Sequence, residues 1–272
     1  MTASVAFETK TVSLRTGVTL EYVEQGDPDG IPVILLHGIS DSWRSYELVL
    51  PYLPPSIRAY AVSERGHGES SRPAAGYATA DFAADVAAFL DAQGCERAVI
   101  VGHSMSASIA LQFAIDYPDL LSGLVVIGTF LDFAGNPVIA EFLEALATFV
   151  DPIDPAFARK FQESTLAKPI PPSYLETVVA ESLKLPARAW QAIMAGLVAT
   201  DFSADLPSIA APTLVIWGEQ DAYPPRADQD RLASAISDAR LHIYEGTGHA
   251  VHWEEPVRFA AELRAFVDQI AI

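Results

Sequence analysis

The chain has 272 residues, of which 50% are hydrophobic, so it is long enough for one α/β domain with an inserted subdomain. Its 17 Lys and Arg against 35 Asp and Glu give a formal net charge of -18, which argues against nucleic acid and anionic membranes as partners. Cys95 is the single cysteine, so no intrachain disulfide can form, and neither a signal peptide nor an apolar run of about 18 residues is visible; we expect a cytoplasmic protein.

The first part of the chain alternates predicted strands with predicted helices. Short strands are expected at residues 12–14 and 20–24. Four later runs are almost wholly apolar, as in strands that are buried on both faces: 32–36, 59–62, 99–101 and 124–127. Helices are expected at residues 79–92 and 109–117, the second ending before Pro118. This alternation predicts a mostly parallel, twisted sheet flanked by helices, an α/β fold.

The pattern changes between residues 132 and 205, where no strand-like run occurs. Four helical stretches separated by prolines are predicted there: 138–149, 156–166, 173–183 and 188–200. The α/β pattern then returns with strands at 212–218 and 240–244 and helices at 226–236 and 256–270. We therefore expect a core domain of residues 1–131 and 206–272 and a four-helix cap of residues 132–205. The cap either roofs the site formed by the carboxyl ends of the strands or has a structural role only.

Ser104 is the most informative residue of the chain. It ends an apolar run within Gly102-His103-Ser104-Met105-Ser106, and a helical stretch follows at once. A strand that turns sharply into a helix holds its apical residue in a strained conformation with the side chain exposed, and needs small neighbours on both sides. The usual pattern has glycine where Ser106 stands. Ser104 is therefore a candidate nucleophile within an imperfect motif.

A serine nucleophile needs a base and a carboxylate that holds the base. His249 follows a predicted strand in a glycine-rich loop and is the favoured base, with His252 as the runner-up. Asp221 follows another buried strand and is the favoured acid, with Asp132 as the alternative. The chain order is then Ser104, Asp221 and His249, nucleophile before acid before base.

An acyl-transfer site also needs donors for an oxyanion. The N–H of Met105, directly after Ser104, is one candidate, and that of Ile39, in the loop that Gly38 allows to turn tightly, is the second. No cluster with metal-ligand spacing and no nucleotide-binding glycine motif is present, so we expect neither a metal nor a cofactor.

Together these segments resemble the α/β-hydrolase superfamily, and most closely its capped group of esterases, lactonases, cofactor-free haloperoxidases and C–C bond hydrolases. The resemblance spans essentially the whole chain and rests on six motifs in the expected order: 36–38, 41–43, 65–70, 102–106, 217–221 and 246–249. It implies that Ser104 is the nucleophile, His249 the base and Asp221 the acid, with Ile39 and Met105 as oxyanion donors. Two positions depart from the common pattern, Ser106 in place of glycine and Ser63 in place of aspartate.

The expected function is a serine hydrolase that cleaves a carboxylic ester or a lactone through an acyl-enzyme. The same triad could instead serve C–C bond hydrolysis, a lyase or a perhydrolase-type reaction, and a non-catalytic binder of small molecules is the third reading. The apolar cap favours a hydrophobic substrate. The residues expected to line its site are Gly38, Phe130, Trp190 and Met194. The sequence leaves open whether the chain forms a homodimer.

Overall fold

The computed structural model describes residues 7–131, 133 and 136–270. An eight-stranded sheet forms its centre, in the order β1-β2-β4-β3-β5-β6-β7-β8. In chain order the strands are β1 (Thr9–Ser13), β2 (Thr19–Gln25), β3 (Ile31–Leu36), β4 (Ile57–Ser63), β5 (Ala98–His103), β6 (Leu121–Ile127), β7 (Thr213–Gly218) and β8 (Ala239–Tyr244). Strand β2 pairs antiparallel with β1 and β4, and the other neighbours pair in parallel.

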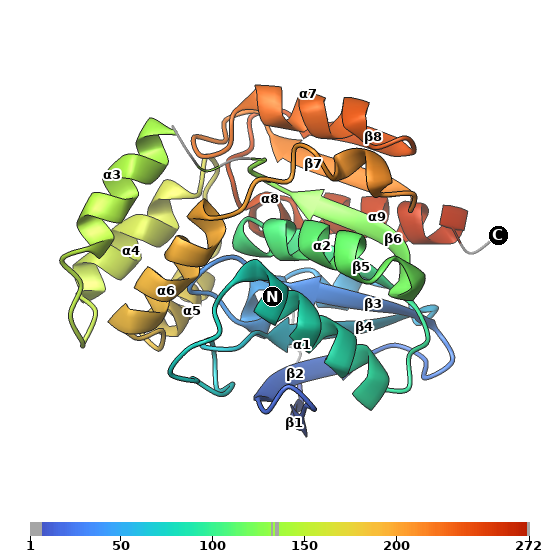
Figure 1. Ribbon diagram of the computed structural model, residues 1–272, viewed down its shortest axis with the longest axis horizontal. Helices are drawn as coiled ribbons and strands as arrows, with labels where there is room; N and C mark the ends of the chain where they lie inside the picture. The colour runs from blue at the N-terminus through green and yellow to red at the C-terminus, as the bar shows by residue number, and fades with distance from the viewer. Residues whose placement is uncertain (1–6, 132, 134–135, 271–272) are drawn as a thin grey trace.

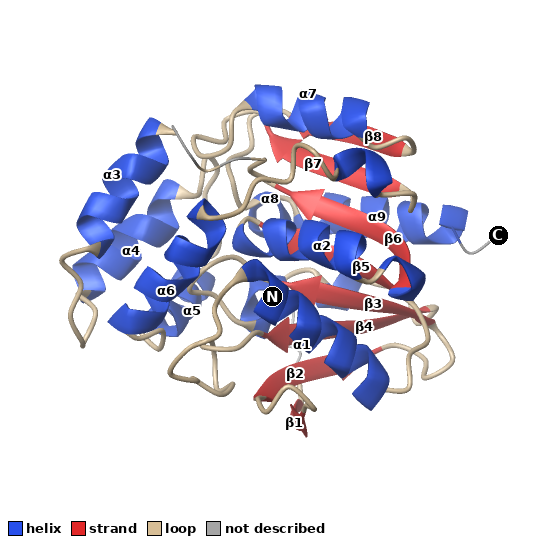
Figure 2. Ribbon diagram, in the orientation of Figure 1, coloured by secondary structure: helices blue, strands red, loops and turns tan. Residues whose placement is uncertain are grey.

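Helices cover both faces of this sheet (Figures 1 and 2). They are α1 (Thr79–Ala92), α2 (Met105–Asp116), α7 (Arg226–Ala235), α8 (Val251–Glu254) and α9 (Pro256–Ile270). Alternate residues of a strand face opposite sides, so Ile34 and Leu36 join the core under α1, α2 and α7, while Val33 and Leu35 join the core under α9. Burial on both faces explains why the central strands are apolar throughout.

Four further helices lie beyond the end of the sheet toward which its parallel strands point (Figure 1). They are α3 (Pro137–Leu146), α4 (Pro155–Ser164), α5 (Pro172–Ser182) and α6 (Ala187–Val198). Each begins at or directly after a proline, a residue suited to the first turn of a helix because it has no N–H to satisfy. They form a cap over the carboxyl edge of the sheet.

The structure confirms the predicted fold class, a mostly parallel sheet flanked by helices with a four-helix cap. The predicted element bounds differ from the observed ones by a few residues, and α8 was not predicted because its four residues are too short for a helical pattern. The division into a core domain and a cap domain at residues 132 and 205 stays a prediction.

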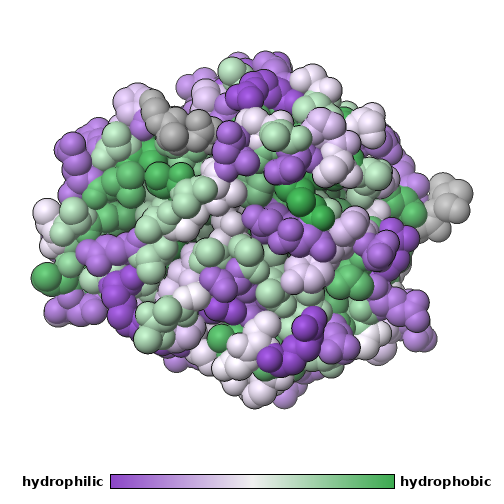
Figure 3. All heavy atoms as spheres, in the orientation of Figure 1, coloured by the Kyte–Doolittle hydropathy of each residue, from purple (hydrophilic) through white to green (hydrophobic). Residues whose placement is uncertain are grey.

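The cap carries much of the apolar surface visible in Figure 3, where green side chains gather over the side on which α3 and α4 lie. Val138, in α3, and Val150, between α3 and α4, are among the large hydrophobic side chains that are exposed. Among the described helices, none is long and apolar enough to cross a bilayer.

Candidate active site

Ser104 lies at a strained turn between β5 and α2. Its backbone has φ 54° and ψ -112°, a left-handed conformation that side chains rarely adopt. The turn is fixed on both sides, because the Ser104 N–H donates to the Ile127 carbonyl at 2.8 Å and the Ala107 N–H donates to the Ser104 carbonyl at 3.0 Å. The predicted sharp strand-to-helix turn is therefore present at this residue.

The small residues around Ser104 are needed because β5 and α2 approach closely. A Cβ at Gly102 would lie 2.0 Å from the carbonyl oxygen of Ser106, so no larger residue fits there. At position 106, where the usual pattern has glycine, the structure accommodates a serine. The fully buried Ser106 hydroxyl contacts the carbonyl of His37 and the carboxyl of Glu64. The departure from glycine adds hydrogen bonds without breaking the turn.

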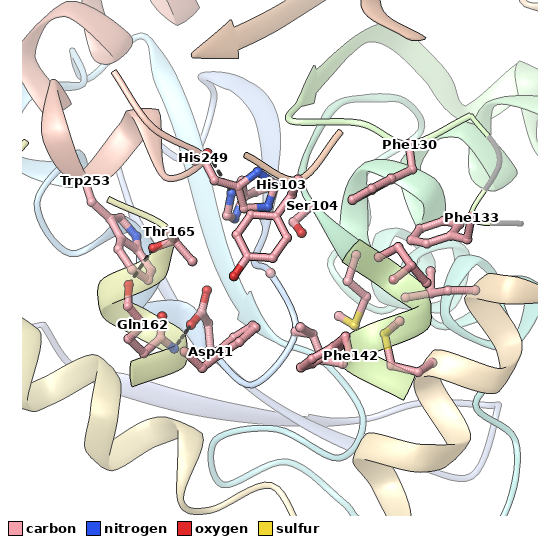
Figure 4. A pocket seen from close by; sticks show the side chains of 18 residues that line it. Asp41, His103, Ser104, Phe130, Phe133, Phe142, Gln162, Thr165, His249 and Trp253 are labelled. Atoms are coloured by element: carbon pink, nitrogen blue, oxygen red, sulfur yellow. Dashed lines mark hydrogen bonds between the residues drawn. The ribbon is translucent and has the colours of Figure 1, made fainter. Parts of the chain in front are cut away.

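His249 and Asp221 form a close pair beside Ser104. The Nδ1 of His249 lies 2.7 Å from Oδ2 of Asp221, and both side chains are almost completely buried. Because the Asp221 carboxylate accepts the Nδ1 proton, Nε2 is left as the ring nitrogen that can take a proton. Ser104 and His249 line the same cavity and lie next to each other in Figure 4. Ser104 Oγ has no hydrogen bond within the described chain, as is common in a site without substrate.

Gly128, directly after β6, has no side chain and so leaves space for His249 and Asp221. Its φ is +58°, and a Cβ built there would lie 2.8 Å from both Cε1 and Nδ1 of His249 and 3.3 Å from Oδ2 of Asp221. Any side chain at this position would displace the histidine–aspartate pair. This residue is not among the predicted site residues, although a glycine at the carboxyl end of a buried parallel strand is a sequence signal for such a position.

The loop of His249 is also tied to the cap. The N–H of His249 donates to the carbonyl of Thr165 at 2.8 Å, and the N–H of Ala250 donates to the same oxygen at 3.2 Å. Thr165 follows α4, so a cap residue holds the backbone of the candidate base.

The two candidate oxyanion donors lie at the same end of the cavity. Ile39 and Met105 both line it, together with Ser104 and Gly38. Met105 is the first residue of α2, so its N–H has no partner one turn earlier in the helix, and the positive end of the helix dipole favours an anion there. The N–H of Ile39 has no acceptor among the described residues. Both donors are therefore available to a ligand.

The cavity has one apolar and one polar side (Figure 4). It is compact, about 50 Å³. The apolar side is formed by Phe130, Phe133, Ile139, Phe142, Met194 and Leu197. The polar side is formed by Asp41, Gln162, Thr165 and Trp253. Among the described lining residues none is Lys or Arg, so the cavity offers no side-chain cation to an anionic ligand.

Asp41 is the most unusual group of the polar side. Its Oδ1 accepts from Nε2 of Gln162 at 2.8 Å, and its Oδ2 lies 3.4 Å from the hydroxyl of Ser45. The residue is only 3% exposed, and burial raises its pKa to about 8, so it carries a proton at neutral pH. Asp41 belongs to one of the six sequence motifs but has no predicted role, and Gln162 is not predicted because it comes from the cap.

A second hollow, of about 330 Å³, lies on the outer side of the cap between α3 and α4. It shares Phe142, Phe161 and Tyr223 with the inner cavity, so these three side chains form the wall between them. The hydroxyl of Tyr223 lies 2.6 Å from that of Ser164 on α4.

Trp190 does not line the cavity, contrary to its expected place there. It is fully buried, and its ring packs against four aromatic rings of the cap, those of Phe142, Phe149, Phe157 and Phe161. The large apolar area of tryptophan makes it the centre of the cap's own core, a role that helical spacing alone does not distinguish from substrate contact. The other expected lining residues, Gly38, Phe130 and Met194, do line the cavity.

The alternative base His252 and the alternative acid Asp132 do not form a second catalytic pair among the described residues. The Nε2 of His252 is within 3.0 Å of the Ser45 hydroxyl, and its ring stacks on Tyr46, with 4.9 Å between the ring centroids. It does not line the cavity with Ser104. Asp132 lies outside the described residues. Among the residues that are described, no group of His, Cys, Asp and Glu could hold a metal ion.

The model of the alpha/beta hydrolase family matches residues 33–262, which include every residue of this site. The chain belongs to the alpha/beta hydrolase family. The family match covers far more than half of the chain and agrees with the fold predicted from the sequence.

Curated relatives of this alpha/beta hydrolase have different activities. It is 29% identical to a non-heme chloroperoxidase of Streptomyces lividans, over 94% of this chain and 99% of the relative. It is 31% identical to a 2-hydroxymuconate semialdehyde hydrolase of Pseudomonas sp. strain CF600, over 88% of this chain and 87% of the relative.

Among solved structures, it resembles Est816, described as an N-acyl homoserine lactone degrading enzyme, at 28% identity and a TM-score of 0.81. That similarity covers 94% of this chain and 100% of the other. The relatives thus show a hydrolase family with several chemistries, and the choice among them depends on the cavity.

Proposed function

We propose that this alpha/beta hydrolase is a serine hydrolase that cleaves an uncharged carboxylic ester or lactone through an acyl-enzyme. The observation that supports this best is the buried 2.7 Å contact between His249 and Asp221 beside a serine held at φ 54°. A strained serine next to a histidine–carboxylate pair is the arrangement that activates a hydroxyl for attack on a carbonyl.

In the first half of the proposed reaction, Ser104 Oγ attacks the carbonyl carbon while Nε2 of His249 takes its proton. The carbonyl oxygen becomes an oxyanion, for which the N–H groups of Ile39 and Met105 are the proposed donors. Collapse of the tetrahedral intermediate breaks the bond to the leaving oxygen, which receives the proton from His249. The acyl group is then bonded to Ser104.

In the second half, His249 takes a proton from water, and the hydroxide attacks the acyl carbon. The carboxylic acid leaves and Ser104 regains its proton. Asp221 keeps the Nδ1 proton of His249 in place throughout and stabilises the imidazolium that forms in each half. Every proton is returned, so no co-reactant other than water is required.

The cavity supports a small, neutral substrate with one apolar and one hydrogen-bonding side. Its aromatic side suits an acyl chain or ring, and Asp41 with Gln162 suits a hydroxyl, carbonyl or amide group on the other side. The volume of about 50 Å³ is well below that of pockets for drug-sized ligands, about 300 Å³ and more. We therefore expect short esters and small lactones to be preferred over long-chain esters.

C–C bond hydrolysis is the second candidate because one relative, at 31% identity, is a 2-hydroxymuconate semialdehyde hydrolase. A semialdehyde of that kind carries a carboxylate. In this chain the described lining contains no Lys or Arg to balance such a charge. This feature favours the ester or lactone substrate.

Labelling with a fluorescent organophosphonate and a substrate panel test the proposal. The panel contains p-nitrophenyl acetate, butyrate and octanoate, small lactones and a vinylogous β-diketone, each with the original protein and Ser104→Ala. We expect labelling of the original protein alone and turnover of the short esters or lactones that Ser104→Ala abolishes. An unlabelled but folded protein, or turnover that survives Ser104→Ala, would refute the nucleophile; exclusive turnover of the diketone would favour C–C hydrolysis.

A further inference from the structure

The Ser106 hydroxyl has one proton but two close oxygen neighbours. Its Oγ is within hydrogen-bond distance of the His37 carbonyl and of Oε2 of Glu64. A carbonyl oxygen can only accept, so the Ser106 proton points to His37 if that contact is a hydrogen bond. The contact with Glu64 is then a hydrogen bond only if the carboxyl group carries a proton and donates it to Ser106.

His37 cannot supply a positive charge to compensate an ionised Glu64. Its Nδ1 lies 2.7 Å from the Gly38 carbonyl and therefore carries a proton, whereas its Nε2 accepts from the Glu64 N–H at 3.1 Å and therefore carries none. The imidazole is thus fixed as the neutral tautomer. Burial agrees with this, because it lowers the pKa of His37 to about 4.

The other groups around Glu64 do not compensate a charge either. The guanidinium of Arg65 is held by Asp85 on α1, with two contacts of 2.6 Å, so the nearest cation is already paired. Tyr46 and His67 also lie near, and an ionised Glu64 would raise the pKa of that tyrosine further. Oε1 of Glu64 has no hydrogen-bond partner among the described residues, which makes a buried carboxylate costly.

We infer that Glu64 is a protonated positioning residue that fixes the spacing of the two oxyanion donors through Ser106. The hydrogen bonds run from the Glu64 carboxyl to Ser106 Oγ and from Ser106 to the His37 carbonyl. This inference rests on the proposed hydrolase function, since it assigns Ile39 and Met105 to the oxyanion.

The network joins the two loops that carry these donors. Ser106 directly follows Met105, and His37 lies two residues before Ile39, so the Ser106–His37 hydrogen bond links the two segments next to the donors. The ring of His37 adds a second fixed point, since it holds the Gly38 carbonyl and is itself held by the Glu64 N–H. A glycine at 106, the usual residue, has no side chain with which to make this link.

The protonation of Glu64 makes the network sensitive to pH. Burial raises the pKa of Glu64 to about 8; the hydrogen bond with Ser106 and the charge of Arg65 offset only part of this effect, and the carboxylate of Asp85 adds to it. When the carboxyl loses its proton, Ser106 turns its own proton toward the carboxylate and the His37 carbonyl loses its donor. The stabilisation of the oxyanion by Ile39 and Met105 then weakens, while binding of the substrate is little affected. As a result kcat falls and KM stays nearly constant.

The test is the pH dependence of kcat and KM between pH 6 and 10 for four proteins: the original chain, Glu64→Gln, Ser106→Gly and Cys95→Ser. The substrate is the short ester that gives the highest turnover. Glutamine keeps an N–H donor for Ser106 and cannot ionise in this range. Cys95→Ser is the control, because Cys95 is also a buried group whose pKa is raised by burial, but it belongs neither to this network nor to the lining of the cavity.

We expect kcat of the original protein and of Cys95→Ser to fall at least roughly tenfold above pH 8, as for a weakened oxyanion site. Glu64→Gln should lose this fall and keep its activity to pH 10. Ser106→Gly should have a kcat roughly tenfold lower at every pH, with KM within about twofold. A fall that persists in Glu64→Gln, or that disappears in Cys95→Ser instead, would overturn the inference.

A spectroscopic measurement covers the case that Glu64→Gln does not fold. Infrared difference spectra of protein labelled with ¹³C in its glutamate carboxyl groups should contain a protonated carboxyl band that titrates near pH 8. Its absence at pH 7 would contradict a protonated Glu64 independently of activity. Turnover that survives Ser104→Ala would refute the proposed function itself, so the two failures are distinguishable.

Discussion

Gly128 offers a substitution that should disturb the candidate base and acid without replacing either residue. A Cβ at this position would lie 2.8 Å from Nδ1 and Cε1 of His249, whereas ordinary contact begins at 3.4 Å. In Gly128→Ala the ring must therefore move by roughly 0.6 Å, or its loop must shift with it. Asp221 is held by the N–H of Tyr223 at 2.9 Å and His249 by the carbonyl of Thr165 at 2.8 Å, so the 2.7 Å contact between them cannot absorb such a movement unchanged.

The expected loss follows from this displacement. A 1 Å misplacement of catalytic groups costs about 100-fold in rate, so a shift of roughly 0.6 Å should lower kcat about 10-fold or more. Stability falls for two reasons. Alanine at φ +58° costs about 1–2 kcal/mol of backbone strain, and the crowding adds about 1–3 kcal/mol.

The variant Gly94→Ala separates the effect of backbone strain from the effect of displacing His249. Gly94 has φ +67°, but nothing lies within 4 Å of a Cβ built there, so this variant has the backbone strain without the contact. The assay is kcat and KM for a short ester, the rate of organophosphonate labelling, and the free energy of unfolding in urea. We expect Gly94→Ala to lose stability alone and Gly128→Ala to lose labelling rate as well. Equal labelling rates in both variants would refute the reasoning.

Three further outcomes are expected. Trp190→Ala should lower the free energy of unfolding by about 3–5 kcal/mol while leaving KM for a short ester unchanged, whereas Met194→Ala should change KM. Asp221→Asn should lower kcat about 10⁴-fold at neutral pH, because the amide stabilises the wrong tautomer of His249. The free energy of unfolding should fall as pH rises from 6.5 to 8, by up to about 1.4 kcal/mol per pH unit for each of Asp41 and Glu64. Both keep their protons to about pH 8 when folded and lose them near pH 4 when unfolded, and urea titrations of Asp41→Asn and Glu64→Gln should show a shallower fall.

The parts of the site that follow strands were predictable from the sequence. Ser104 comes directly after β5, and Asp221 and His249 lie in the loops that follow β7 and β8. Parallel strands bring their carboxyl ends to one edge of a sheet. That rule needs only the alternation of apolar runs and helices, which the chain displays clearly. The structure brings the three residues to one region, as expected from the pattern.

Contacts between the cap and the core could not be predicted in the same way. Gln162 reaches Asp41 across 121 positions of sequence, and the Thr165 carbonyl meets the N–H of His249. Such contacts depend on how the cap helices sit on the sheet, and helical spacing does not contain that information. For the same reason Trp190 could be expected at the cavity, although it belongs to the interior of the cap.

The backbone strain in the structure shows what these cap contacts do. Among the described non-glycine residues, positive φ occurs at Ser40 and Ser104, and both lie in loops of the cavity. Strain of this kind costs about 1–3 kcal/mol and persists only where the surroundings hold it. Ser104 is held by the core, through the carbonyl of Ile127.

Ser40 is held from the cap. Its hydroxyl lies 3.1 Å from that of Ser182, at the end of α5, and Gln162 on α4 donates to Ser182 at 2.7 Å and to Asp41 at 2.8 Å. The loop that presents Ile39 is thus fixed by Glu64 and Ser106 on the side of the sheet and by two cap helices on the other. The cap therefore covers the cavity and also holds the loop of Ile39. Any opening of the cap that breaks these hydrogen bonds also releases the strained loop, so access of substrate and the geometry of the proposed oxyanion site are coupled.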